Sequence, residues 1–142
     1  MTTSSSSSDS AASDSAASDS AGVAALADLL FSSIRDNDVE TLRTKVYAPD
    51  VKIWHNTDNL EQGIDQNLRV LAWISKNIAG VRYEDVRRQV SPTGFVQQHV
   101  LRGTAPSGAE LNVPACLIGE VADGRITRIN EYLDSAHVAA ML

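Results

Sequence analysis

Three ionisable side chains fall on strand faces that are otherwise apolar: His55, His99 and Glu131. Side chains two residues apart in a strand point to the same face. Each of the three has large apolar neighbours two or four residues away, namely Val51, Ile53, Phe95, Leu101, Ile129 and Leu133. Burying an unpaired imidazole or carboxylate is costly, so we expect these groups to pair with one another or to line a cavity.

The chemistry that such a set offers is general acid–base catalysis. Histidine titrates near neutral pH, which suits it to proton transfer. Glu131 is expected to bond one imidazole nitrogen of His99, which would fix the tautomer and leave the other nitrogen to exchange a proton with substrate. Alternatively, His55 would act as an independent base. For any one residue a purely structural role is an equally good interpretation, but the occurrence of all three on inward faces favours a functional pocket.

Four further residues are candidates for the pocket wall, where they would contact substrate: Gln97, Trp73, Tyr83 and Phe95. Gln97 and Phe95 share the strand face of His99, because all three have odd numbers on one predicted strand. Trp73 and Tyr83 fit a position in the core as well as one in the wall. The charged run from Glu84 to Arg88 is interpreted as a solvated face with a β-bulge.

The elements that position these residues follow from hydrophobic periodicity. Apolar residues at helical spacing predict helices over 23–37, 38–46 and 64–78, the second with Asp38 as its N-cap. Alternation and turn residues predict strands over 51–56, 81–91, 94–105, 110–121 and 125–134. Helices followed by a run of strands with short turns indicate an α+β fold with a mostly antiparallel sheet, curved around a pocket and wrapped by the N-terminal helices.

The first 22 residues differ from the rest of the chain. They contain ten Ser, five Ala and three Asp, with no aromatic or basic residue. Because no apolar residue after Met1 in this stretch is larger than Ala, we expect a disordered Ser/Ala/Asp-rich tail over 1–22 and a folded domain over 23–142. The stretch lacks the basic and apolar regions of a signal peptide, so the expected compartment is the cytoplasm.

The composition argues against several functional classes. The chain has 18 acidic and 12 basic residues and a net charge of −6, without the basic excess that nucleic-acid binding requires. No stretch approaches the roughly 18 apolar residues of a membrane span. The one cysteine, Cys116, cannot form an internal disulfide, and no Cys/His cluster has zinc spacing. We therefore expect no nucleic-acid or membrane partner and no metal site.

The order of elements, together with particular strings, resembles the SnoaL-like branch of the nuclear transport factor two-like superfamily. The strings are Asp50 to Asn56, Gly63 before the third helix, Gly124 to Ile129, and Glu131 to Asp134. The resemblance covers about residues 23 to 136. It implies a cone-shaped α+β barrel with one deep pocket and, commonly, a homodimer packed through the outer face of the sheet.

The resemblance also suggests what the candidate residues replace. Ketosteroid isomerase-like members carry a carboxylate base at the position of His55, and their proton-donating acid falls near Cys116. Limonene-epoxide hydrolase-like members use an Arg and an Asp two residues apart on one strand and a second Asp near the C-terminus. Those positions hold Gln97, His99 and Glu131 in this chain. The departures disfavour a steroid isomerase or limonene-type mechanism.

Three hypotheses remain open at this point. The first is a cofactor-free enzyme of the SnoaL-like type, performing cyclase, isomerase or hydrolase chemistry on a small apolar molecule. The second is a non-catalytic small-molecule binding protein on the same scaffold. The third is a protein-interaction dimer in the manner of the transport factor, for which the sequence offers no peptide-binding feature. A coupled histidine–carboxylate pair would favour the enzyme, and inward groups that are satisfied separately would favour the binding protein.

Overall fold

The computed structural model of the chain describes residues 5–141. Its elements follow in the order α1 (Ser5–Arg35), α2 (Val39–Thr41), the π-helical turn η1 (Leu42–Val46), β1 (Tyr47–His55), β2 (Glu61–Gln62), α3 (Ile64–Asn77), β3 (Ala79–Ser91), β4 (Gly94–Thr104), β5 (Glu110–Ala122), β6 (Arg125–Leu133) and α4 (Ser135–Ala139). Helices come first and strands follow, so the predicted α+β class is confirmed.

The six strands form one sheet in the order β2-β1-β6-β5-β4-β3. Every neighbouring pair is antiparallel except β1 and β6, which run parallel. The β5–β6 hairpin turns at Asp123 and Gly124, both of which have positive φ (52° and 72°). This is the backbone of a type I′ turn, for which Asp-Gly is a preferred pair. The predicted, mostly antiparallel sheet is therefore correct.

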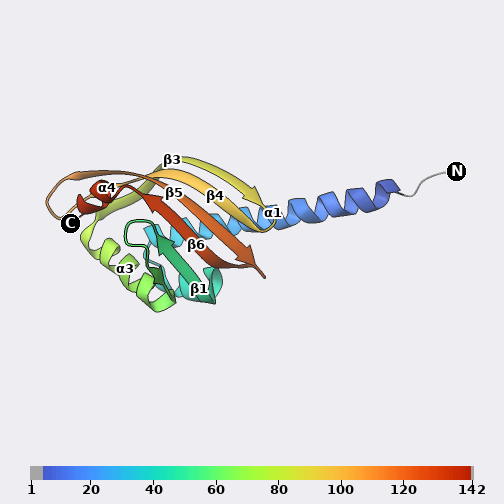
Figure 1. The fold of residues 1–142 in the computed structure, drawn as a ribbon, viewed down its shortest axis with the longest axis horizontal. Coiled ribbons are helices and arrows are strands. Elements are labelled where there is room, and N and C mark those ends of the chain that lie inside the picture. Colours follow the sequence, from blue (N-terminus) through green and yellow to red (C-terminus); the bar gives the residue numbers. More distant parts are fainter. Residues whose placement is uncertain (1–4, 142) are drawn as a thin grey trace.

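Helices cover one face of this sheet, and Figure 1 shows α1 running behind it with α3 beside β1. The main core lies between that face and the helices and includes Leu30, Leu42, Val51, Leu117 and Ile126. A smaller core under α4 joins Ile78, Ala105, Leu111, Val113 and Met141. The face toward the helices is called the inner face below, and the opposite one the outer face.

The start of strand β1 differs from the sequence prediction. Strand β1 begins at Tyr47, four residues before the predicted start, and its register with β6 shifts between Tyr47 and Lys52. Pro49 lies in this interval and has no N–H to give to the ladder, which accounts for the interruption. The helix predicted after Asp38 is present, and the Asp38 carboxylate accepts a hydrogen bond from the Thr41 N–H at 3.1 Å.

Helix α1 continues on its N-terminal side far beyond the domain. Figure 1 shows this part projecting from the body, and residues 14–19 are exposed, with burial beginning at Val23. The stretch is helical from Ser5, where the sequence predicts disorder; its alanines have the highest helix propensity of any residue. A helix without a packed face is marginal in water, so disorder of 1–22 in solution stays a prediction. In residues 5–141, no helix has the length and apolar character of a membrane span.

Candidate functional site

The inner face of the sheet, α1 and α3 enclose a cavity of about 90 Å³. Its wall is mainly aliphatic and aromatic, with six polar side chains, which are Tyr47, His55, Asn67, Tyr83, His99 and Glu131. A buried water needs roughly 10–15 Å³ of such space, so the cavity has room for several waters or one very small molecule. A larger ligand would require the wall to move.

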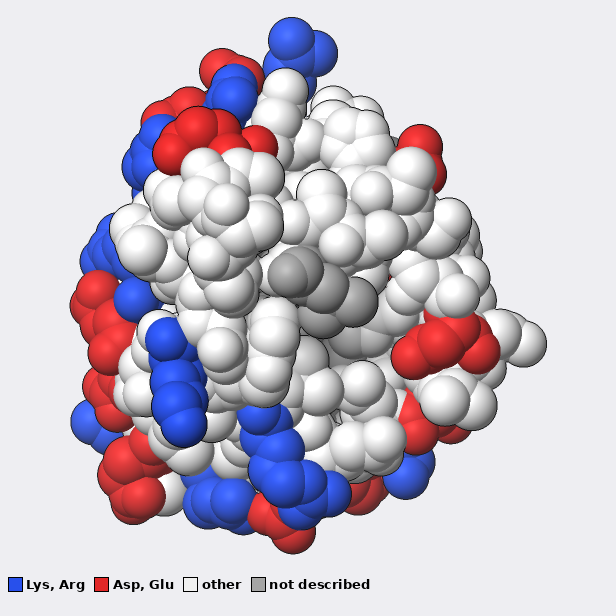
Figure 2. All heavy atoms as spheres, turned by 90° about the vertical axis from the view of Figure 1, so that its left-hand side faces the viewer, with Lys and Arg blue, Asp and Glu red and all other residues white. Residues whose placement is uncertain are grey.

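The cavity reaches the surface beside helix α3. Val70 lines the cavity and is also 38 % exposed, and Trp73, one turn further along the helix, is 39 % exposed. Figure 2 shows the end of the molecule that carries α3 and α4, where uncharged side chains occupy the middle and charged ones gather at the rim.

His99 projects from β4 into the cavity wall and is nearly fully buried. Its Nδ1 lies 2.9 Å from Nε2 of Gln97, two residues earlier on the same face. The rings of Tyr83 and Phe31 meet the imidazole edge-on, with centroid distances of 4.8 and 5.4 Å. Removal from water disfavours the charged imidazolium, and this burial lowers the pKa of His99 to about 4. The residue is therefore neutral around pH 7.

A chain of hydrogen bonds connects this histidine to helix α1. Gln97, only 1 % exposed, accepts a bond at its Oε1 from Nε of Arg88 at 2.8 Å. The Nη1 of Arg88 donates in turn to Oδ1 of Asp28 at 2.6 Å and to the carbonyl of Ala24 at 3.5 Å. The guanidinium thus enters the protein between α1 and the inner face, with its charge offset by the Asp28 carboxylate.

A β-bulge brings Arg88 to the inner face. Tyr83 pairs with Leu101 and Arg88 with Gln97, so the six residues 83–88 of β3 oppose the five residues 97–101 of β4. The extra residue falls between Glu84 and Arg87, where Asp85 has a φ of 54°. The predicted bulge is present. The prediction of a wholly solvated charged face is wrong for Arg88, because the bulge reverses the alternation of faces after it.

Glu131 and His55 lie opposite each other on the parallel strands β6 and β1. Both line the cavity. Burial raises the pKa of the Glu131 carboxyl, and the nearby His55 acts in the opposite direction. Burial, followed by the charge of Glu131, also raises the phenol pKa of both Tyr47 and Tyr83, which line the same cavity.

The α3 side of the cavity carries a second polar network. The Tyr47 hydroxyl donates to Oδ1 of Asn67 at 2.9 Å, and Nδ2 of Asn67 donates to Oε1 of Gln62 at 3.3 Å. All three residues are buried. None of them is among the candidates predicted from the sequence. Asn67 could have been recognised from the sequence, because it lies beside Leu68 within the apolar stripe of the predicted helix, where a buried polar residue needs a hydrogen-bond partner.

The expected bond between His99 and Glu131 is absent from the hydrogen bonds of the described residues, and Gln97 is the partner of His99. In the register, β5 separates the two strands, with Leu117 opposite Glu131 and Ala115 opposite His99. Two strand spacings amount to about 10 Å. The two groups therefore reach the cavity from strands on either side of β5.

The remaining predicted residues have different positions. Tyr83 lines the cavity, whereas Gln97 lies outside the cavity wall and is hydrogen-bonded to Nδ1 of His99. Phe95 is buried in the main core against Gly119, and a Cβ on that glycine would come within 2.4 Å of the Phe95 ring. Trp73 lies toward solvent on α3. Neither Phe95 nor Trp73 belongs to the cavity wall.

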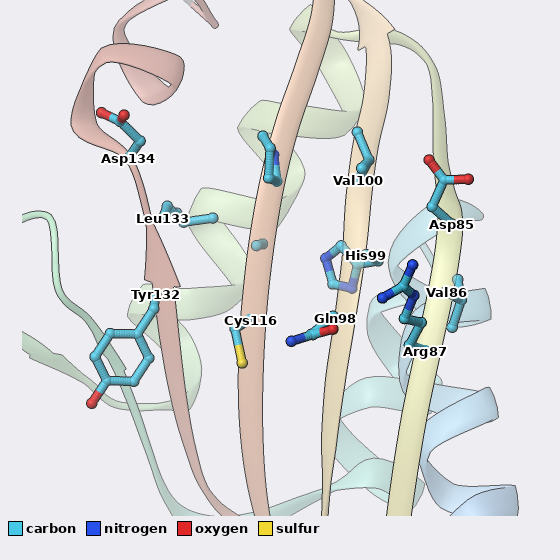
Figure 3. A pocket seen from close by; sticks show the side chains of 12 residues that line it. Asp85, Val86, Arg87, Gln98, His99, Val100, Cys116, Tyr132, Leu133 and Asp134 are labelled. Atoms are coloured by element: carbon cyan, nitrogen blue, oxygen red, sulfur yellow. The ribbon is translucent and has the colours of Figure 1, made fainter.

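The outer face of the sheet carries a separate, open groove of about 790 Å³, shown in Figure 3. Gln98, Cys116 and Tyr132 lie on its neighbouring strands β4, β5 and β6. Tyr132 is 45 % exposed and packs edge-on against Trp54 at a centroid distance of 5.3 Å. The lining of this groove combines apolar and uncharged polar groups with the charged side chains of Asp85, Arg87 and Asp134.

Within residues 5–141, no group of three or more His, Cys, Asp or Glu side chains has the arrangement of a metal site. The polar groups that face the cavity are a carboxyl, two imidazoles, two phenols and one amide. These groups can donate, accept and transfer protons. The site is therefore equipped for acid–base chemistry and for orienting an uncharged ligand.

Comparison with known proteins agrees with this architecture. The family model of the SnoaL-like domain matches residues 24–129. A putative polyketide cyclase from Xanthomonas campestris pv. campestris has a similar structure, with a TM-score of 0.75 and 16 % identity over 87 % of this chain and 98 % of that one. PrhC from Penicillium brasilianum gives a TM-score of 0.76 and 10 % identity over 87 % of each chain. An LEH-like epoxide hydrolase from M. tuberculosis gives 0.69 and 15 % identity over 87 % of this chain and 90 % of that one. Comparison with curated protein sequences gives no match.

Proposed function

Because the chain belongs to the SnoaL-like family, we propose that it is a cofactor-free enzyme performing acid–base chemistry on a small, mainly apolar molecule in the internal cavity. The observation that carries this proposal is the pair Glu131 and His55, which lies side by side at an apolar cavity with His99 on the far side. A polyketide cyclase and an epoxide hydrolase among proteins of similar structure support a reaction of this general type.

Glu131 is the group that we assign to proton transfer. A carboxyl whose pKa is raised by burial is a stronger base and holds its proton closer to neutral pH. With a ketone bound, the Glu131 carboxylate would remove a proton from the carbon beside the carbonyl. The C–H bond breaks, an O–H bond forms on Glu131, and the electron pair moves to the carbonyl oxygen. The same carboxyl then returns its proton to carbon.

His55 modulates this step through its charge. When the imidazole carries a proton, its attraction favours the ionised form of Glu131, which lowers the pKa of that carboxyl. The charge of His55 therefore bears on the protonation of Glu131. His55 can also exchange a proton with solvent water that enters the cavity. In this arrangement His55 and Glu131 form the acid–base pair, and His99 acts from the other side of the ligand.

A non-catalytic binding protein is the second candidate, and one observation favours it. His99 is hydrogen-bonded by Gln97 and lacks a hydrogen bond to Glu131 in the described part of the chain, so the two inward groups are not bonded to each other. Such an arrangement can orient a ligand without turnover. The two candidates differ in whether a bound ligand exchanges protons with the protein.

The test is solvent deuterium exchange, followed by proton NMR in D₂O with cyclohexanone and ethyl acetoacetate as probes. Cyclohexene oxide, followed by diol formation, tests hydrolysis. Wild-type protein is expected to accelerate exchange, and Glu131→Gln should lose that acceleration. Glu120→Gln is the matched control, because Glu120 is exposed on β5. Binding of the probes without exchange would support the binding protein, and equal rates for wild type and Glu131→Gln would overturn the assignment of Glu131.

We propose in addition that the protein forms a homodimer through the outer face. Support comes from the exposed apolar side chains on that face, which include Val96, Ile118 and Tyr132. The double substitution Ile118→Lys and Tyr132→Lys should then give a monomer in sedimentation equilibrium. Val90→Lys is the control, since Val90 is equally exposed but pairs with Phe95 and so lies on the inner face. A monomeric wild-type protein would contradict this proposal.

A further inference from the structure

Arg88, Gln97 and His99 form a directional chain of hydrogen bonds, and its direction is set by chemistry at the Arg88 end. A guanidinium has only donors, so the atom of Gln97 that lies 2.8 Å from Nε of Arg88 must be the acceptor Oε1. The amide of Gln97 therefore cannot turn over without losing this charge-assisted bond. Its NH₂ group is left facing His99.

The orientation of Gln97 determines the protonation of His99. The Nε2 of Gln97 lies 2.9 Å from Nδ1 of His99, and an amide NH₂ can only donate. Nδ1 must therefore be unprotonated and accept this bond. The neutral ring then has its proton on Nε2. Protonating Nδ1 would place two donors against each other in a site that is nearly fully buried.

We propose that Arg88 and Gln97 are positioning residues that hold His99 as the neutral Nε2–H tautomer, so that the site selects ligands with an uncharged oxygen acceptor such as a ketone, ester or epoxide. This deepens the proposed function and, for the class of substrate, rests on it. In this role His99 donates a hydrogen bond to the ligand and does not act as its base. Proton transfer is left to Glu131 and His55.

The surroundings of Nε2 agree with a donor that is reserved for a ligand. In the described part of the chain, every fully buried side-chain nitrogen or oxygen has a hydrogen-bond partner. Nε2 of His99 has none among the described residues, so this atom reaches open space, and His99 lines the cavity. A carbonyl oxygen bonded there would lie across the cavity from Glu131. An ammonium ligand has only hydrogen-bond donors, so it cannot accept a bond from the Nε2–H of His99.

The charged and titratable groups around His99 come from several elements. Tyr83 on β3 touches its ring, and Arg88 reaches it through Gln97 with Asp28 of α1 behind. Glu131 on β6, with Tyr47 and His55 on β1, faces the same cavity. The ionised form of Glu131 would favour an imidazolium. The hydrogen bond from Gln97 to Nδ1 of His99, with Gln97 held in place by Arg88, is called the lock below, and it has to oppose that attraction. Removing the lock should make His99 easier to protonate.

Nitrogen NMR tests this directly on the full-length protein labelled with ¹⁵N-histidine, without ligand or turnover. Long-range proton–nitrogen correlations distinguish protonated from unprotonated ring nitrogens, and a His99→Gln sample assigns the His99 signals. Near pH 7, wild-type His99 is expected to show an unprotonated Nδ1 and a protonated Nε2. A protonated Nδ1 in the wild type would overturn the proposal.

Two variants test the role of the lock. In Gln97→Glu, a carboxylate faces Nδ1, so this nitrogen should gain a proton. In Arg88→Met, Gln97 is free to turn over, and both tautomers of His99 should appear. Arg82→Met is the control, because Arg82 is a half-exposed arginine on the same strand that pairs with Glu84, and it should leave the wild-type pattern unchanged. A wild-type pattern in both lock variants would contradict the positioning role, and either variant alone suffices if the other fails to fold.

A ligand titration tests the selectivity. Cyclohexanone should shift the Nε2–H signal of His99, and Gln97→Glu should bind it roughly five- to tenfold more weakly, the size of one hydrogen bond. Cyclohexylammonium should not bind. Tighter binding of the ammonium than of the ketone would overturn the selectivity. If the tautomer is as predicted but deuterium exchange fails, the proposed enzyme is wrong and the lock stands. If exchange occurs but Nδ1 is protonated, the lock is wrong and the enzyme stands.

Discussion

Glu131 and His55 face each other across the parallel strands β6 and β1 at the wall of an apolar cavity. Parallel pairing is unusual in this sheet, since β1 and β6 are its one parallel pair among the described strands. It places residues from the start and the end of the folded domain in one register. The pair therefore exists only after the sheet has assembled, and neither residue could form it within a local hairpin.

Glu131→Gln is expected to preserve the fold and to increase stability at neutral pH. The pKa of this carboxyl is raised in the folded protein, so the folded state binds its proton more tightly than the unfolded state does. The unfolding free energy of the wild type must then fall as pH rises above the ordinary glutamate pKa, by about 1.4 kcal/mol for each unit of pKa shift. Urea unfolding at pH 4.5 and pH 8 measures this. If the unfolding free energy of the wild type changes between these two pH values by the same amount as that of Glu131→Gln, the raised pKa is contradicted.

His99 should give a pH dependence of the opposite sign. Its pKa is lowered from 6.5 to about 4, so the unfolded state takes up the proton first as the pH falls. The stabilisation by neutral His99 is complete above pH 6.5 and is lost between pH 6.5 and 4, up to about 3 kcal/mol. The difference in unfolding free energy between wild type and His99→Gln should shrink over that range. A constant difference for His99→Gln would show that His99 is not buried in the neutral form.

Gly119→Ala is expected to destabilise the protein by about 1–3 kcal/mol, because the added methyl would overlap the Phe95 ring. The ring packs in the main core and has little freedom to move. Gly22→Ala, in contrast, is expected to increase the unfolding free energy. No atom lies within 4 Å of its added Cβ, and alanine in place of glycine within a helix adds roughly 0.5–1 kcal/mol. Chemical denaturation of the two variants checks both signs, and a neutral Gly119→Ala would mean that Phe95 is loosely packed.

Removal of residues 2–20 should change the unfolding free energy by less than about 0.5 kcal/mol, because residues 14–19 are exposed and burial begins at Val23. Removal of residues 2–27 takes away the buried side chains of Val23, Leu26 and Ala27 and should cost at least about 2 kcal/mol. Urea unfolding of the two truncated chains separates the projecting segment from the domain. A large loss with the shorter deletion would assign a structural role to the tail.

The class of the fold could be predicted from sequence because its signals are local. Asp38 caps a helix, Asp123-Gly124 makes a tight turn, and alternation marks each strand. Alternation also placed His55, His99 and Glu131 on inward faces, and all three line the cavity. Their inward direction depends only on the period of the strands, so it survives errors of a few residues in the boundaries.

The partners within the site could not be predicted in the same way. Arg88 reaches Gln97 because one extra residue near Asp85 reverses the faces of β3, and a bulge of this kind has no unique position in the sequence. The pairing of His99 with Gln97 and not with Glu131 depends on the order of strands, which places β5 between β4 and β6. Phe95 became a core residue because Gly119 lies opposite it on β5.

The carboxyl of Glu131 is the centre of the proposed chemistry, and ¹³C NMR titration of the labelled side chain observes it directly. Glu131→Gln identifies its signal. The midpoint is expected above the ordinary range of glutamate, and it should rise further in His55→Asn, because His55 lowers the pKa of this carboxyl in the wild type. A midpoint in the ordinary range that is unchanged in His55→Asn would contradict both the raised pKa of Glu131 and the influence of His55 on it, and with them the acid–base function proposed for this site.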